Sequence, residues 1–207
     1  MGQGSRFAFL VLTLCLSVFI VGPVPAQAVT LQVNGSGILT GATGVNAGGT
    51  LYDVEFVDGT CVALFNGCNA VSDFTFQTSA SALAASQALL TDVLLDGALG
   101  TFDIDPEKAN GCTSTILCII MTPYFVSGTS VSASSALNFS PPATDQPGSS
   151  GLVSNITPGA SVTYARWIAA TAVPEPNSLI LFGLGLVALV LWDYRHRQGR
   201  RTGTPLK

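Results

Sequence analysis

Alternating hydrophobic and polar positions predict a β-hairpin in the middle of the chain. Residues 50–57 alternate from Tyr52 through Phe56, a pattern that is typical of a strand with one buried face. Asp58-Gly59 is a turn pair, and residues 60–65 are expected to return as the second strand.

The rest of the central region predicts an α+β domain, with a single antiparallel sheet and one main helix packed on it. Leucines recur near helical spacing over residues 79–95, where a serine can cap the start and Asp96-Gly97 ends the helix. Glycine, serine and proline predict loops at residues 35–49 and 140–151. Further strands are expected at residues 71–77, 116–121, 131–139 and 161–170.

The first 28 residues have the pattern of a secretory signal peptide that forms a short signal helix. Arg6 supplies the positive start, and residues 7–21 form an apolar run. Ala26 and Ala28 then provide the small-x-small pattern that signal peptidase accepts, so we expect cleavage after Ala28. An uncleaved N-terminal anchor is the alternative.

A second apolar run lies near the C-terminus, at residues 179–192. A helix of this length covers about 21 Å, against a hydrocarbon core of about 30 Å. We therefore expect a marginal transmembrane helix over residues 178–194, which suits a temporary anchor; a buried core helix is the alternative. Basic residues after a span stay in the cytoplasm, which places residues 29–173 outside. This membrane-stop cluster consists of Arg195, Arg197, Arg200 and Arg201.

The residues just before this run carry a specific motif, formed by Val173, Pro174, Glu175 and Pro176. Together with the following serine, the glycine-containing apolar helix and the arginines, the motif resembles the PEP-CTERM sorting signal. The resemblance covers residues 173–201 and implies secretion across the inner membrane of a Gram-negative bacterium. It also implies that an exosortase, a membrane-embedded cysteine transpeptidase, recognises the Pro-Glu-Pro element. Such systems usually accompany exopolysaccharide and biofilm production.

These observations divide the chain into three parts: a signal peptide at residues 1–28, an extracytoplasmic domain at 29–170 and a sorting signal at 171–207.

The charge of the central part narrows the range of expected partners. Ten acidic and two basic side chains give residues 29–173 a net charge of −8. Nucleic acid is not an expected partner, because phosphate binding needs clustered lysine and arginine.

Four cysteines remain after removal of the signal peptide, and an even number in an exported domain predicts disulfides. Three connectivities are possible. We favour Cys61–Cys68 and Cys112–Cys118, because each of these pairs closes a local loop. A zinc site is the alternative, although the cysteines are further apart than in the pairs of zinc ribbons.

The side chains that could carry chemistry are carboxylates. The only histidine is His196, so the exported domain cannot hold a Ser-His-Asp or Cys-His arrangement or a histidine-ligated metal. Asp53 and Glu55 share one face of a regular strand and could act as an acid–base pair. Residues 103–107 begin like a calcium-binding loop but lack the required glycine and final acid. We expect a solvated turn there, with calcium binding as the alternative.

We therefore expect a non-enzymatic exported protein that uses no cofactor. It would be held briefly in the inner membrane and then sorted to the cell surface or extracellular matrix. Signal peptidase, an exosortase and exopolysaccharide are its expected partners. One alternative is a carbohydrate- or calcium-binding module, in which Tyr164 and Trp167 would offer a sugar platform instead of packing in the core. Another is a hydrolase built on Asp53, Glu55 or the acidic side chains of residues 103–107, which we call the Asp103 group.

Overall fold

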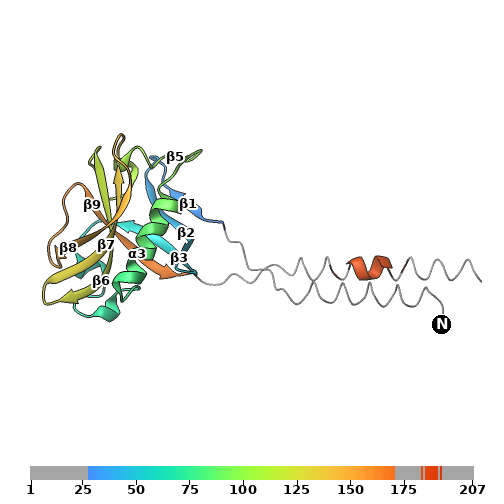
Figure 1. Ribbon diagram of the computed structural model, residues 1–207, viewed down its shortest axis with the longest axis horizontal. Coiled ribbons are helices and arrows are strands. Elements are labelled where there is room, and N and C mark those ends of the chain that lie inside the picture. Colours follow the sequence, from blue (N-terminus) through green and yellow to red (C-terminus); the bar gives the residue numbers. More distant parts are fainter. Residues whose placement is uncertain (1–27, 171–182, 184, 191, 193–207) are drawn as a thin grey trace, which may run out of the picture. The chain divides into compact units, whose positions relative to one another are not determined.

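The fold is built around one seven-stranded sheet with the strand order β1-β2-β3-β9-β6-β7-β8 (Figure 1). It is seen in a computed structural model that describes residues 28–170, 183, 185–190 and 192. The strands are β1 (Thr30–Val33), β2 (Leu39–Ala47), β3 (Thr50–Val57), β6 (Leu117–Ser127), β7 (Ser130–Phe139), β8 (Gln146–Val153) and β9 (Val162–Ala169).

β9, the last strand in the sequence, lies in the middle of the sheet. β9 pairs antiparallel with β3 and parallel with β6, where Ile119 lies opposite Val162 and Met121 opposite Tyr164. All other neighbouring strands of this sheet are antiparallel. The expected single antiparallel sheet is therefore wrong: the sheet is mixed, because β9 joins two meanders that are each antiparallel.

The main helix is confirmed where the leucine spacing predicted it. α3 (Ser79–Ala88) continues without a break into a π-helical turn, η2 (Leu89–Val93). The cap is Thr78 and not Ser79 or Ser81 as expected, since the Thr78 hydroxyl accepts the Ser81 N–H at 3.2 Å. The shorter elements are α2 (Cys61–Leu64), η1 (Val71–Asp73), β4 (Asp96–Gly97), β5 (Gly100–Thr101) and η3 (Pro106–Lys108).

Two expected strands are absent from the described sheet. Residues 60–65 form α2 instead of a hairpin partner for β3, because the Thr60 hydroxyl accepts the Ala63 N–H and begins a helical turn. Both edges of β3 are already paired, with β2 and β9. Residues 71–77 begin with η1 and continue as irregular backbone that forms no strand; Phe74 and Phe76 lie in two different hydrophobic clusters.

Two expected loops contain strands instead. Residues 35–49 include β2, where glycine permits close strand packing: a Cβ on Gly41 would lie 2.1 Å from the Val54 carbonyl oxygen. Gly48 and Gly49, at φ 64° and 91°, form the two-residue turn between β2 and β3. Within residues 140–151, β8 begins at Gln146 and pairs with β7.

α3 covers one face of the sheet and encloses the helix-side core. Figure 1 shows the helix lying across the sheet, where it contacts β2, β6 and β7. Trp167 of β9 is nearly fully buried here, and its indole N–H donates to the buried Thr122 hydroxyl at 3.1 Å. The helix-side core also contains Val54, Phe56, Phe76, Ala82, Ala85, Leu89, Ile120, Ala136 and Ala165.

The opposite face is covered by the segment from α2 to η1, which encloses the disulfide-side core. Cys61 and Cys68 are paired and fully buried there. Phe65 packs edge-on against Tyr164 and Phe74, at centroid distances of 5.5 and 5.6 Å. The other members are Met121, Val126, Val131 and Ala133.

The second disulfide joins Cys112 to Cys118 within the helix-side core. It ties the segment after η3 to the start of β6. Both favoured cysteine pairings are therefore confirmed, with one bridge in each core.

Much of what was expected at the two ends of the chain lies outside the described residues. This holds for most of the signal peptide and for the basic tail. In the C-terminal apolar run, residues 183, 185–190 and 192 are helical. Among the described residues, no helix has the length and hydrophobicity that a membrane crossing requires.

The buried indole–hydroxyl pair yields a prediction for stability. Thr122→Val should lower the free energy of unfolding by about 1–3 kcal/mol, because it leaves the Trp167 N–H buried without an acceptor. In a Trp167→Phe background the same change should cost less, since no donor is left unpaired. Urea unfolding of all four proteins measures this coupling, and equal costs in both backgrounds would contradict the assigned bond.

The Cys61–Cys68 bridge yields a second prediction. Cys61→Ala/Cys68→Ala should lower the free energy of unfolding by about 2.5 kcal/mol on the chain-entropy estimate for so short a loop. The loss should be visible in urea unfolding under oxidising conditions. A double variant as stable as the native protein would show that this bridge does not hold the cover of the second face in place.

Candidate functional site

The residues expected to direct sorting lie outside the described part of the chain. This applies to Ala26 of the signal-cleavage pattern, to the motif and to the membrane-stop cluster. Ala28 is described and lies exposed just before β1. The described residue nearest the motif is Ala170, which follows β9 directly and donates its N–H to the Leu51 carbonyl at 3.0 Å. The folded domain therefore extends to within three residues of Val173.

The strand carboxylates lie on one face of β3, as expected, but each has a structural partner. Asp53 accepts the Gly44 N–H at 3.0 Å, in the region where the β2–β3 register shifts. Glu55 forms an ion pair with Arg166 of β9, whose Nε donates to the carboxylate at 3.1 Å. These interactions hold neighbouring strands together, and a partly exposed pair of this kind contributes up to about 1 kcal/mol.

The Asp103 group forms a turn whose proline begins η3, as expected for a solvated turn. Asp96 accepts the Asp103 N–H at 2.9 Å, and Asp105 accepts the Thr101 hydroxyl at 2.5 Å. Burial raises the pKa of the nearby Asp145 carboxyl, and repulsion by Asp103 adds to that shift, whereas the Phe139 N–H opposes it. In the described part of the chain, no three acidic, cysteine or histidine side chains are grouped so that they could hold a metal ion.

The two aromatic residues considered as a sugar platform are buried. Tyr164 lies in the disulfide-side core and Trp167 in the helix-side core, so the packing interpretation is confirmed. Burial raises the pKa of Tyr164 to about 12. Its hydroxyl has no hydrogen-bond partner among the described residues.

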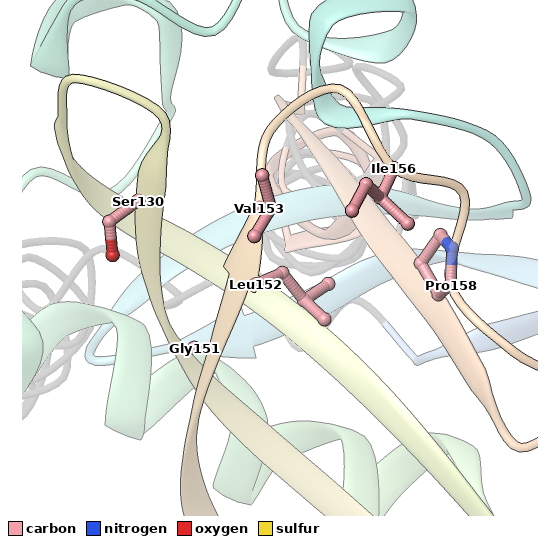
Figure 2. Close-up of a pocket in the computed structure, with 6 residues that line it drawn as sticks. All are labelled: Ser130, Gly151, Leu152, Val153, Ile156 and Pro158. Carbon is pink, nitrogen blue, oxygen red and sulfur yellow. The ribbon is translucent and has the colours of Figure 1, made fainter.

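One open hollow, of about 380 Å³, lies where β8 ends. Figure 2 shows the Leu152 side chain on the strand and the Ile156 and Pro158 side chains on the following loop, arranged around it. Val153 and Ile156 are largely exposed beside the hollow. It is an apolar depression with few polar groups.

A larger groove, of about 650 Å³, lies between α3 and the β2–β3 turn. We call it the Tyr52 groove. One wall is the start of α3 and another is the turn at Gly48, where an added Cβ would lie 3.9 Å from the Ala84 Cβ. The lining residues are Ala47, Gly48, Thr50, Tyr52, Thr75, Phe76, Gln77, Thr78, Ala80, Ser81 and Ala84.

Sequence reasoning missed this groove. Its walls come from residues 35–49, expected as a loop, and residues 71–77, expected as a strand, so their meeting at the start of α3 could not be anticipated. No sequence motif marks the groove. Its polar side chains carry hydroxyl groups and one amide, which are common on protein surfaces.

Comparison with known protein families gives a match near the C-terminal end of the chain. Residues 172–195 match the model of the PEP-CTERM protein-sorting motif. The chain carries a PEP-CTERM sorting signal. The motif indicates exosortase-dependent sorting of an exported protein, and its position overlaps the proline-containing motif and the apolar run. No curated protein and no solved structure matches the chain.

The loop after Cys68 yields a prediction on pH. The Asp73 carboxylate accepts the N–H groups of Asn69 and Ala70, both at 3.0 Å, and these bonds lower the pKa of Asp73 below its ordinary 3.8. A carboxyl group with a lowered pKa in the folded state stabilises the protein at pH values above its unfolded-state pKa. This stabilisation is lost as the pH falls through the folded-state pKa.

We therefore expect Asp73→Asn to lower stability at pH 7, and the difference from the native protein to shrink below about pH 4. Urea unfolding between pH 2.5 and 7 measures it. Asp58→Asn is the control, because that carboxylate has no hydrogen-bond partner among the described residues. A difference for Asp73→Asn that does not change with pH would contradict the assigned bonds.

Proposed function

We propose that the protein is a non-enzymatic surface or matrix protein that an exosortase releases from a temporary membrane anchor. The match to the sorting motif at residues 172–195 carries this proposal. In the proposed sequence of events, signal peptidase cuts after Ala28 and the domain folds outside the cytoplasm. The apolar run then holds it in the inner membrane as a single span, and cleavage near the Pro-Glu-Pro element delivers it outward.

The chemistry of the domain supports delivery outside the cytoplasm. Two buried disulfides suit an oxidising compartment, and a net charge of −8 between residues 29 and 173 favours solubility after release. An acidic domain of this kind is repelled by anionic membrane surfaces. Release from the anchor would therefore free it to diffuse into a matrix, with exopolysaccharide as the proposed associate.

The arrangement of the carboxylates supports a non-enzymatic role. Asp53, Glu55 and Asp105 are each occupied by a strand or turn contact. Neither hollow is lined by a carboxylate. A hydrolase would need two acids facing a substrate-sized cavity.

Replacement of Pro174, Glu175 and Pro176 by alanine tests the proposal. The variant should accumulate uncut in the inner membrane of a cell that contains an exosortase, while the native protein is shortened and leaves the membrane fraction. Thr171→Ala/Asn177→Ala flanks the same element without removing it and serves as the control. Immunoblots of membrane, surface and medium fractions give the measurement, and equal shortening of the alanine variant would overturn the proposal.

A further inference from the structure

We propose that the Tyr52 groove is a binding site for a neutral oligosaccharide. The proposal concerns the folded domain and does not depend on cleavage by an exosortase. The groove has the size of a small-ligand site, which spans about 300–1,000 Å³. It is also larger than the apolar hollow at the end of β8.

The groove lacks charge in a strongly acidic domain. None of its lining side chains is acidic or basic, although ten carboxylates lie between residues 29 and 173. A phosphorylated or carboxylated ligand would find no lysine or arginine there, and a cationic ligand would find no carboxylate. Burying an unpaired ionic group is costly, so the lining selects an uncharged ligand.

Aromatic side chains give the groove a rigid floor. The Tyr52 ring packs against Phe76 at a centroid distance of 5.0 Å and edge-on against Trp167 at 6.1 Å. Phe76 also contacts Trp167, at 5.5 Å, so the three rings fix one another. Tyr52 is only partly buried and can present apolar surface to the C–H face of a sugar ring.

Polar groups around this floor are available to a ligand. Thr50, Tyr52 and Gln77 line the groove, and their hydroxyl and amide groups have no hydrogen-bond partner among the described residues. In contrast, the Thr75 hydroxyl is engaged by the Trp167 carbonyl, and Thr78 is engaged by Ser81. The three available groups can donate and accept, as the hydroxyls of a saccharide require. A purely apolar ligand would leave them desolvated and unpaired.

Titration calorimetry on the full, uncleaved chain tests the site. The protein is kept in a detergent without a sugar headgroup, and the probes are cellohexaose, laminarihexaose, mannohexaose and chitohexaose. Hexagalacturonate and the glucosamine hexamer serve as anionic and cationic comparisons. We expect at least one neutral probe to bind with a Kd below about 1 mM, and neither charged probe to bind as tightly.

Three variants locate the binding. Gln77→Ala should weaken it by about fivefold, through loss of a hydrogen bond. Ala84→Gln should abolish it by filling the groove from α3. Gln87→Ala removes the same amide from an exposed position of α3 outside the groove and should leave the affinity unchanged. Circular dichroism melts check that every variant is folded.

Several results would overturn the proposal. One is that none of the four neutral probes binds. Another is that binding persists unchanged in both Gln77→Ala and Ala84→Gln, which would place the ligand elsewhere. A third is that a charged probe binds more tightly than every neutral one. Because the chain in this experiment is uncleaved, each of these results leaves the exosortase proposal untouched.

Discussion

The placement of β9 in the middle of the sheet is the constraint on which the rest of the structure depends. β1, β2 and β3 form one antiparallel meander and β6, β7 and β8 form another, and only β9 joins them. β9 also supplies Tyr164 to one core and Trp167 to the other. The sheet is therefore incomplete until the chain has been synthesised and exported as far as Ala169. The folded domain ends just before the sorting motif begins at residue 172.

A central strand with two buried faces needs cover on both sides. α3 provides it on one face through alanines that allow close approach to the sheet. On the other face the cover is the short segment from α2 to η1, and the Cys61–Cys68 bridge closes the first half of that segment into a loop. Asn66, Gly67 and Cys68 all have positive φ there, and the Asp73 carboxylate anchors the backbone that follows. The Cys61–Cys68 disulfide and the Asp73 carboxylate hold this segment in place, where a longer helix would be held by its own packing.

Local patterns were enough to predict part of this fold. Tyr52 to Phe56 alternates because β3 has one face in the helix-side core, and the leucines after Ser79 mark the helix that covers it. The glycines of β2 led to the wrong prediction of a loop, because their role appears only when β2 pairs with β3. Gly41 has to be glycine because the Val54 carbonyl of β3 leaves no room for a Cβ, and the glycine content of residues 35–49 does not reveal that pairing. The parallel contact of β6 with β9 was missed for the same reason, since it joins residues more than forty positions apart.

The candidate sites also differ in how far the sequence could predict them. The sorting motif and the cysteine pairs are local features. The motif was recognised by its resemblance to a known sorting signal, and the short loops between the cysteines favoured the pairing that the structure has. The Tyr52 groove is assembled from two separate stretches, residues 47–52 and 75–84, so only the tertiary structure brings its residues together. Asp53 and Glu55 were correctly placed on one face, but their partners Gly44 and Arg166 become neighbours only through the sheet.

The intact mass of the protein recovered from outside the cell tests the central claim most directly. The account predicts a chain that begins at Val29, ends after Ala170 so that β9 is retained, and weighs less than the thiol form by four hydrogen atoms. A mass with free thiols, an uncut N-terminus, or a C-terminus within β9 would contradict an exported, disulfide-closed domain released beyond its last strand.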